Sequence, residues 1–184
     1  PSTAADTIST ADATTTADAT TTDTTAAAAP MATDIGAIPP GQLSVGRTNG
    51  VAVGVRDVLL FAGGYTDAKG KTKSSAVDIY NVTSRTWSLT HLSSGRTLFA
   101  GTGFGDLAFF GCGETDGVHT ETDAVDVWNA SSGQWLPRTF ARLSQPRKKC
   151  SATSIILATA PTGEILHGAV VFAGGWPRGG HDQS

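Results

Sequence analysis

Short runs of apolar residues, separated by turn-forming residues, follow one another along most of the chain. They occupy residues 51–55, 58–61, 76–80 and 85–89, and again residues 98–103, 107–110, 124–128 and 134–136. Short runs that are bounded by Gly, Asn, Asp and Ser are typical of β-strands. Outside an Ala-rich N-terminal stretch, no longer run shows the apolar spacing of a helix. The pattern therefore predicts an all-β fold.

The two sets of runs are copies of each other at an offset of 48 or 49 residues. The matching pairs are Arg47 with Arg96, 61–64 with 110–113, 77–81 with 125–129, and Trp87 with Trp135. A third copy opens at Arg147 and reaches its Gly-Gly pair at 174–175. We call these unit one (about 47–92), unit two (about 96–136) and unit three (about 147–184), of which the last contains the first half of the pattern. Extra residues around 158–168 predict a lengthened hairpin loop in unit three.

Each full unit contains an arginine, an apolar strand followed by two small residues, an Asp-containing strand that ends in an aromatic residue, and a later Trp. These residues are Arg47, Phe61, Gly63, Gly64, Asp78, Tyr80 and Trp87 in unit one, Arg96, Phe110, Cys112, Gly113, Asp126, Trp128 and Trp135 in unit two, and Arg147, Phe172, Gly174 and Gly175 in unit three. Over roughly residues 42–184, this order resembles the kelch repeat, whose period is about 50 residues. The resemblance implies a kelch-type β-propeller in which each unit is one four-stranded antiparallel blade.

The signature residues have physical roles in such a fold. A Gly-Gly pair allows positive φ and a close approach of neighbouring blades, and Cys112 can replace one Gly if φ there is not positive. Each Trp is expected to pack between blades. The Asp residues and the opening arginines are expected to hydrogen-bond between blades or to anchor loops.

The repeat count predicts an unfinished propeller. Propellers close with about 4–8 blades, whereas two and a half units leave an open arc. We therefore expect a piece of a longer kelch protein, and we expect the open edges to self-associate.

The N-terminal segment has a different composition. Residues 1–29 contain 11 Thr, 10 Ala and 4 Asp, with Ile8 as the only large apolar residue. Such a segment buries too little surface to offset its chain entropy. The expected organisation is a disordered low-complexity tail over 1–40, followed by kelch repeats over 41–184.

The charge balance argues against polyanionic partners. The chain carries 13 basic and 16 acidic residues. Because five of the acidic residues lie in 1–34, the remainder has 13 basic and 11 acidic residues, a net charge of +2. No nucleic-acid footprint is present, and no apolar stretch is long enough to predict a membrane span.

Charged residues concentrate in the loops that join the strands. The partner-binding candidates are Lys69, Lys71 and Lys73 in unit one, Glu114, Asp116, His119, Glu121 and Asp123 in unit two, and Arg138, Arg142, Arg147 and Lys148 in the connection to unit three. The acidic loop could hold a divalent cation, but its spacing matches no calcium-loop pattern, and a solvated loop is the simpler interpretation. In kelch propellers these loops line one face that binds partners, which the resemblance extends to this chain.

The two cysteines and the two N-glycosylation sequons give information about the cellular compartment of the protein. Cys112 and Cys150 are 38 residues apart, and no disulfide between them is predicted. Asn81 and Asn129 are N-glycosylation candidates in equivalent turns, although Asn also favours turns for backbone reasons. The sequons and the Thr-rich tail favour an extracellular or cell-surface setting, whereas unpaired cysteines favour the cytoplasm.

The favoured function is a non-catalytic module that binds a protein partner through the blade-end loops. We predict no catalytic residue, no metal and no cofactor. The alternative is a carbohydrate-binding or galactose-oxidase-like extracellular propeller, but the Tyr and His residues show no convergent copper-ligand pattern. A purely structural repeat array is the third hypothesis.

Overall fold

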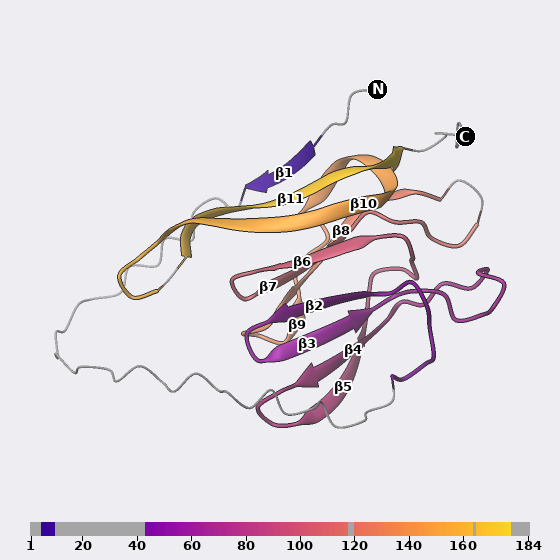
Figure 1. Ribbon diagram of the computed structural model, residues 1–184, viewed down its shortest axis with the longest axis horizontal. Helices are drawn as coiled ribbons and strands as arrows, with labels where there is room; N and C mark the ends of the chain where they lie inside the picture. Colours follow the sequence, from indigo (N-terminus) through magenta and orange to yellow (C-terminus); the bar gives the residue numbers. More distant parts are fainter. Residues whose placement is uncertain (1–4, 10–42, 118–119, 164, 178–184) are drawn as a thin grey trace.

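The computed structural model describes residues 5–9, 43–117, 120–163 and 165–177 (Figure 1). The described part is all-β and contains no helix, as the apolar runs predicted. Most of the predicted tail over 1–40 lies outside these residues. Ala5–Ser9 differs from that prediction, because it forms strand β1.

Unit one forms a four-stranded antiparallel sheet in sequence order. Its strands are β2 (Val51–Val55), β3 (Val58–Ala62), β4 (Ala76–Asn81) and β5 (Thr86–His91). Burial alternates along β3, whereas β4 is buried along almost its whole length. The strands therefore begin and end within two residues of the apolar runs.

Unit two repeats this arrangement. Its strands are β6 (Ala100–Phe104), β7 (Leu107–Gly111), β8 (Thr122–Asn129) and the short β9 (Gln134–Trp135), which pairs with β8. The recurrence of one strand order in both units confirms the antiparallel sheets that the repeat offset predicted.

Unit three is a long hairpin of β10 (Arg142–Thr159) and β11 (Ile165–Pro177). The extra residues around 158–168 lengthen both strands, so the prediction of a lengthened loop is wrong. Moreover, β10 starts early enough to pair with β8 at Arg142 and Arg147, which joins units two and three into one seven-stranded sheet with the order β1-β11-β10-β8-β7-β6 and β9 beside β8.

Two apolar cores lie between the units. The first holds β2, β3 and β4 side chains against Phe99, Phe110 and Trp128 of unit two. The second packs β7 and β8 side chains against Leu143, Val170 and Phe172 of unit three. Each unit thus packs against the next across an apolar core, and the units follow one another in sequence order (Figure 1).

Glycines permit the close approach of β2 and β6. A Cβ atom at Gly101 would lie 2.7 Å from Val53 Cγ2 and 2.8 Å from Val51 Cγ1. A Cβ atom at Gly103 would similarly lie 2.7 Å from the carbonyl oxygen of Gly54. Any larger residue in these places would push the two sheets apart.

The two tryptophans differ in their packing. Trp135 contacts Phe110 in its own unit and donates a hydrogen bond from Nε1 to Thr90 Oγ1 of unit one at 2.8 Å, so it lies between units as expected. Trp87 packs on Phe61 and Tyr80 within its own unit.

Cys112 corrects two expectations. Its φ is 72°, so this position does require the left-handed region, like the Gly63 position that it replaces. It also forms a disulfide with Cys150, over a Cα–Cα distance of 6.5 Å, and the prediction of no disulfide is wrong. Backbone hydrogen bonds bring the two together, because Gly113 N donates to Arg147 O and Lys149 N donates to Leu98 O.

The opening arginines are buried anchors. Arg47 forms an ion pair with Asp78, and Arg96 forms one with Asp126. The same carboxylates accept hydrogen bonds from the backbone N–H of Ser44 and of Ser93. Each pair therefore ties the segment before the first strand of a unit to the third strand of that unit, which is the loop-anchoring role expected from the sequence.

Candidate functional site

The loops after the Gly-Gly positions of units one and two meet part of β10 at one end of the sheets, which we call the loop end (described residues 63–75, 112–117, 120–121 and 148–149). Glu114 lies at their meeting point, held by backbone bridges to Thr97 and Glu121. Its carboxylate accepts a hydrogen bond from Tyr65 Oη at 3.2 Å and one from Lys148 Nζ at 2.8 Å. One side chain of unit two thus contacts units one and three together.

Further ion pairs extend this contact. Lys73 Nζ lies 3.6 Å from Glu114 and 3.9 Å from Asp116, and Lys148 Nζ lies 3.2 Å from Glu121. We call the six residues the loop-end network: Tyr65, Lys73, Glu114, Asp116, Glu121 and Lys148. The predicted basic loop of unit one does lie beside the acidic loop of unit two.

The network is mostly shielded from solvent. The side chains of Lys73 and Glu121 are 6% and 5% exposed, whereas that of Asp116 is 60% exposed. Burial reduces screening by water and salt, so the inner pairs contribute more than exposed pairs do. The inner charges therefore hold the loops together, and Asp116 remains open to solvent.

The pKa shifts follow from this arrangement. Burial acts to raise the pKa of Glu114, but the hydrogen bond and charge of Lys148, the charge of Lys73 and the Tyr65 hydroxyl lower it below its ordinary value. The hydrogen bond to Glu114 raises the pKa of Lys148 against the effect of burial. Burial, with the neighbouring Glu114 charge, raises the pKa of Tyr65. The ionised forms of Glu114 and Lys148 thus support each other.

Sequence analysis named Glu114 as a candidate but missed that it belongs to a repeated position at this end. Tyr65, Glu114 and Trp176 each follow the Gly-Gly position of their unit directly. In unit three, Lys149 Nζ lies 3.9 Å from the centre of the Trp176 ring, a cation–π contact. The repeat alignment could have singled out this position, because it is the first side chain after each left-handed pair.

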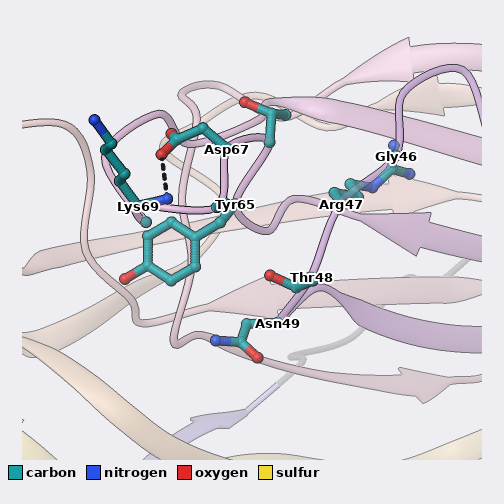
Figure 2. Close-up of a pocket in the computed structure, with 10 residues that line it drawn as sticks. Gly46, Arg47, Thr48, Asn49, Tyr65, Asp67 and Lys69 are labelled. Atoms are coloured by element: carbon teal, nitrogen blue, oxygen red, sulfur yellow. Dashed lines mark hydrogen bonds between the residues drawn. The ribbon is translucent and has the colours of Figure 1, made fainter.

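An open hollow of about 540 Å³ lies beside the network in unit one. Residues 46–49 and 65–70 line it. Figure 2 shows the Tyr65 ring between Lys69 and Asn49. The Asp67 carboxylate accepts hydrogen bonds from the backbone N–H of Lys69, Lys71 and Thr72, and these bonds to Thr72 and Lys71 lower its pKa. This turn fixes the shape of the hollow and directs Lys69 and Lys71 outward.

The remaining partner-binding candidates are placed differently. Lys69, Lys71, Arg138 and Arg142 are exposed. Arg138 donates to Ser93 O at 3.0 Å, and Arg142 forms an ion pair with Asp123 at 2.8 Å. Arg147 is 5% exposed and donates to Gly174 O, so it belongs to the interior with Arg47 and Arg96. His119 lies outside the described residues.

Both sequon asparagines lie in tight turns at the opposite end of the sheets, the turn end (residues 56–57, 81–85, 105–106 and 129–133). Asn81 Oδ1 accepts from Ser84 N at 2.7 Å, and Asn129 Oδ1 accepts from Ser131 N at 2.8 Å. These contacts account for Asn at both positions through turn geometry. They do not themselves indicate glycan attachment.

Within the described residues, no three His, Cys, Asp or Glu side chains are grouped as metal ligands would be. The described part also has no helix that is long and apolar enough to cross a membrane.

Comparison with known proteins adds information about the fold. No protein-family model matches the chain, and no curated protein does. Among solved structures, 127 chains match, and one of them is the structure of YjhT. The superposition has a TM-score of 0.50 at 17% sequence identity and covers 71% of this chain and 42% of YjhT. The chain thus spans less than half the length of this neighbour, and the likeness concerns the fold alone.

Proposed function

We propose that the chain is part of a kelch-type β-propeller and that it binds a protein partner, without catalysis, through the loop end. The supporting observation is the loop-end network, in which Glu114 holds the loops of units one and two against β10 of unit three. Loops that are fixed before binding lose less entropy when a partner docks. Preorganised loops on a rigid sheet scaffold are a common form of recognition surface.

Exposed charges at the loop end and in the connection beside it are the second support. Lys69 and Lys71 extend from the Asp67 turn, and Arg138 and Arg142 extend from the connection to unit three. Charges at the rim of an interface mainly set the association rate and the choice of partner. A partner surface with acidic residues complements these side chains.

The proposal is tested with a photo-crosslinking amino acid placed in the full chain at exposed Ala68 of the loop end. The matched control carries the same group at exposed Ser132 of the turn end. We expect a defined protein from the source cells to crosslink at position 68 and not at position 132. Equal capture at both positions, or none at position 68, would contradict loop-end binding.

Charge reversal at Lys69 and Lys71 then measures how much these exposed charges contribute to partner affinity. Lys69→Glu with Lys71→Glu is expected to weaken the captured partner's affinity about three- to tenfold, mostly through a slower association rate. Arg85→Glu, an exposed change at the turn end, is the control and should leave the affinity unchanged. A loss that is equal for both variants would mean that net charge, rather than the loop end, governs binding.

Carbohydrate binding is the second candidate function, and the hollow in unit one favours it. An aromatic ring beside amide and carboxylate groups suits a sugar, and Tyr65, Asn49 and Asp67 supply these groups. A glycan array with the wild-type chain and with Asn49→Ala tests this candidate. Retention of a glycan that the variant loses would favour it over a protein partner.

A further inference from the structure

Strand β1 lies along the outer edge of β11 (Figure 1). Ala5–Ser9 pairs antiparallel with residues 169–173, from Ala5 opposite Ala173 to Ser9 opposite Ala169. In units one and two, the strand at this place is the third strand of the unit, β4 beside β3 and β8 beside β7. An N-terminal segment thus takes the third-strand place of unit three.

The register of β1 equals that of the other third strands. Asp78 lies opposite Phe61 in unit one, and Asp126 lies opposite Phe110 in unit two. Asp6 lies opposite Phe172. Since Phe61, Phe110 and Phe172 are equivalent positions of the repeat, an aspartate occurs at the same place in all three sheets.

The residue two positions after the aspartate is also large in all three strands. Tyr80 and Trp128 follow the aspartates of units one and two, and Ile8 follows Asp6. The other aspartates before unit one lie at 12, 18, 23 and 34, and each is followed two positions later by Thr or Gly. Among the aspartates of this segment, Asp6 alone has the Asp-x-large apolar spacing.

The aspartate has a defined task in the first two units. It pairs with a buried arginine, Arg47 in one and Arg96 in the other. Arg147 is the equivalent arginine of unit three, is 5% exposed, and donates to Gly174 O, as Arg96 donates to Cys112 O at the equivalent position of unit two. The surroundings that select an aspartate in units one and two therefore recur beside β11.

We propose that the edge of β11 is an acceptor site for an extended strand with the pattern Asp-x-large apolar, and that Ala5–Ser9 of the same chain fills it as a surrogate third strand. Strand addition to a sheet edge gains affinity from main-chain hydrogen bonds and specificity from alternate side chains. The connection from residue 10 to the start of β2 is long enough to reach any edge of the molecule. A strand from the same chain is favoured over one from another molecule, because its effective concentration at the edge of β11 is high. This site is separate from the loop end and does not depend on partner binding there.

The test is amide hydrogen exchange of residues 169–173 in the full chain. Asp6→Lys and Ile8→Asp are each expected to speed exchange there about tenfold or more, because each variant loses the Asp-x-large apolar pattern that the acceptor site selects. Asp12→Lys has the same charge change outside β1 and should exchange like the wild type. Residues 150–156 of β10 serve as the internal reference for an intact hairpin.

A peptide supplied in trans completes the test. A synthetic peptide of residues 3–11 should restore the protection of 169–173 in the Asp6→Lys chain, and a peptide with Asp6 and Ile8 exchanged should not. Equal exchange in the wild type, Asp6→Lys and Ile8→Asp would overturn the proposal, as would equal rescue by both peptides. Protection that grows with protein concentration would overturn supply from the same chain and indicate strand exchange between copies.

Discussion

Replacement of Arg96 by Met tests how much the buried anchors contribute to stability. The Arg96 side chain is fully buried and forms an ion pair with Asp126, which is 6% exposed. Its guanidinium also donates to Ala124 O at 3.1 Å and to Ser93 Oγ at 3.3 Å. Burial lowers the pKa of Arg96, and the Asp126 charge partly offsets that effect. The variant would leave a buried carboxylate without its cation.

The expected magnitude follows from this unpaired charge. Removal of one partner from a buried ion pair costs about 3–5 kcal/mol of unfolding free energy. Domains of this kind have a total stability of about 5–15 kcal/mol, so Arg96→Met should remain folded only marginally. The exposed pair of Arg56 and Asp106 is the matched control, with side chains 52% and 43% exposed. Arg56→Met should cost at most about 1 kcal/mol.

Urea unfolding with the disulfide intact measures both variants. The double variant Arg96→Met with Asp126→Leu removes both charges and should recover a large part of the loss, because the desolvation cost of the lone carboxylate disappears. A single-variant loss below about 1 kcal/mol, equal to that of Arg56→Met, would refute the argument. Equal losses in the single and double variants would show that packing, and not charge, sets the effect.

Three further predictions concern the loop end, the disulfide and the contact between units. The pKa of Glu114 is lowered in the folded state, so the stabilisation from its ionised form is present above about pH 4.5 and is lost as the pH falls through the lower folded pKa. Glu114→Gln should therefore flatten the acid side of a plot of unfolding free energy against pH. An unchanged acid side would contradict the network. Denatured, unreduced protein should show no reactive thiol, and Cys150→Ala should cost about 2–4 kcal/mol in urea unfolding, whereas Cys112→Gly should lose about 1 kcal/mol less because the φ of 72° suits Gly. Gly101→Ala should cost about 1–3 kcal/mol in thermal unfolding because of its contacts with Val51 and Val53, and Gly46→Ala, with no atom within 4 Å, should be neutral; equal effects would refute the close packing.

The sheets could be predicted from the sequence because their signals are local and repeated. The apolar runs and turn residues of units one and two mark strand limits, and the offset between Arg47 and Arg96 marks the repeat. Burial of the arginines was harder to predict from the sequence, because an arginine beside charged loops is expected to be exposed. Arg147, which stands next to Lys148 and Lys149, illustrates this.

The features that sequence analysis missed depend on contacts between distant residues. The disulfide required that the backbone of 147–149 lie against 98 and 113, which no local pattern encodes. The loop-end network required the positions of two loops and of β10 together, although the charges themselves were recognised. β1 was missed because a Thr- and Ala-rich segment has weak local preferences, and its pairing is visible only through the register of β11.

The pairing of β1 with β11 also has a consequence for the time course of folding. Ala5 and Ala173 are 168 positions apart, the longest separation of any strand pair in the described sheets. Ribosomes add about 5–20 residues per second, so the first strand waits roughly ten to thirty seconds before its neighbour leaves the ribosome. Contacts of such high order form late and slowly. During this interval β1 is without its neighbouring strand and is open to a chaperone or to a neighbouring nascent chain.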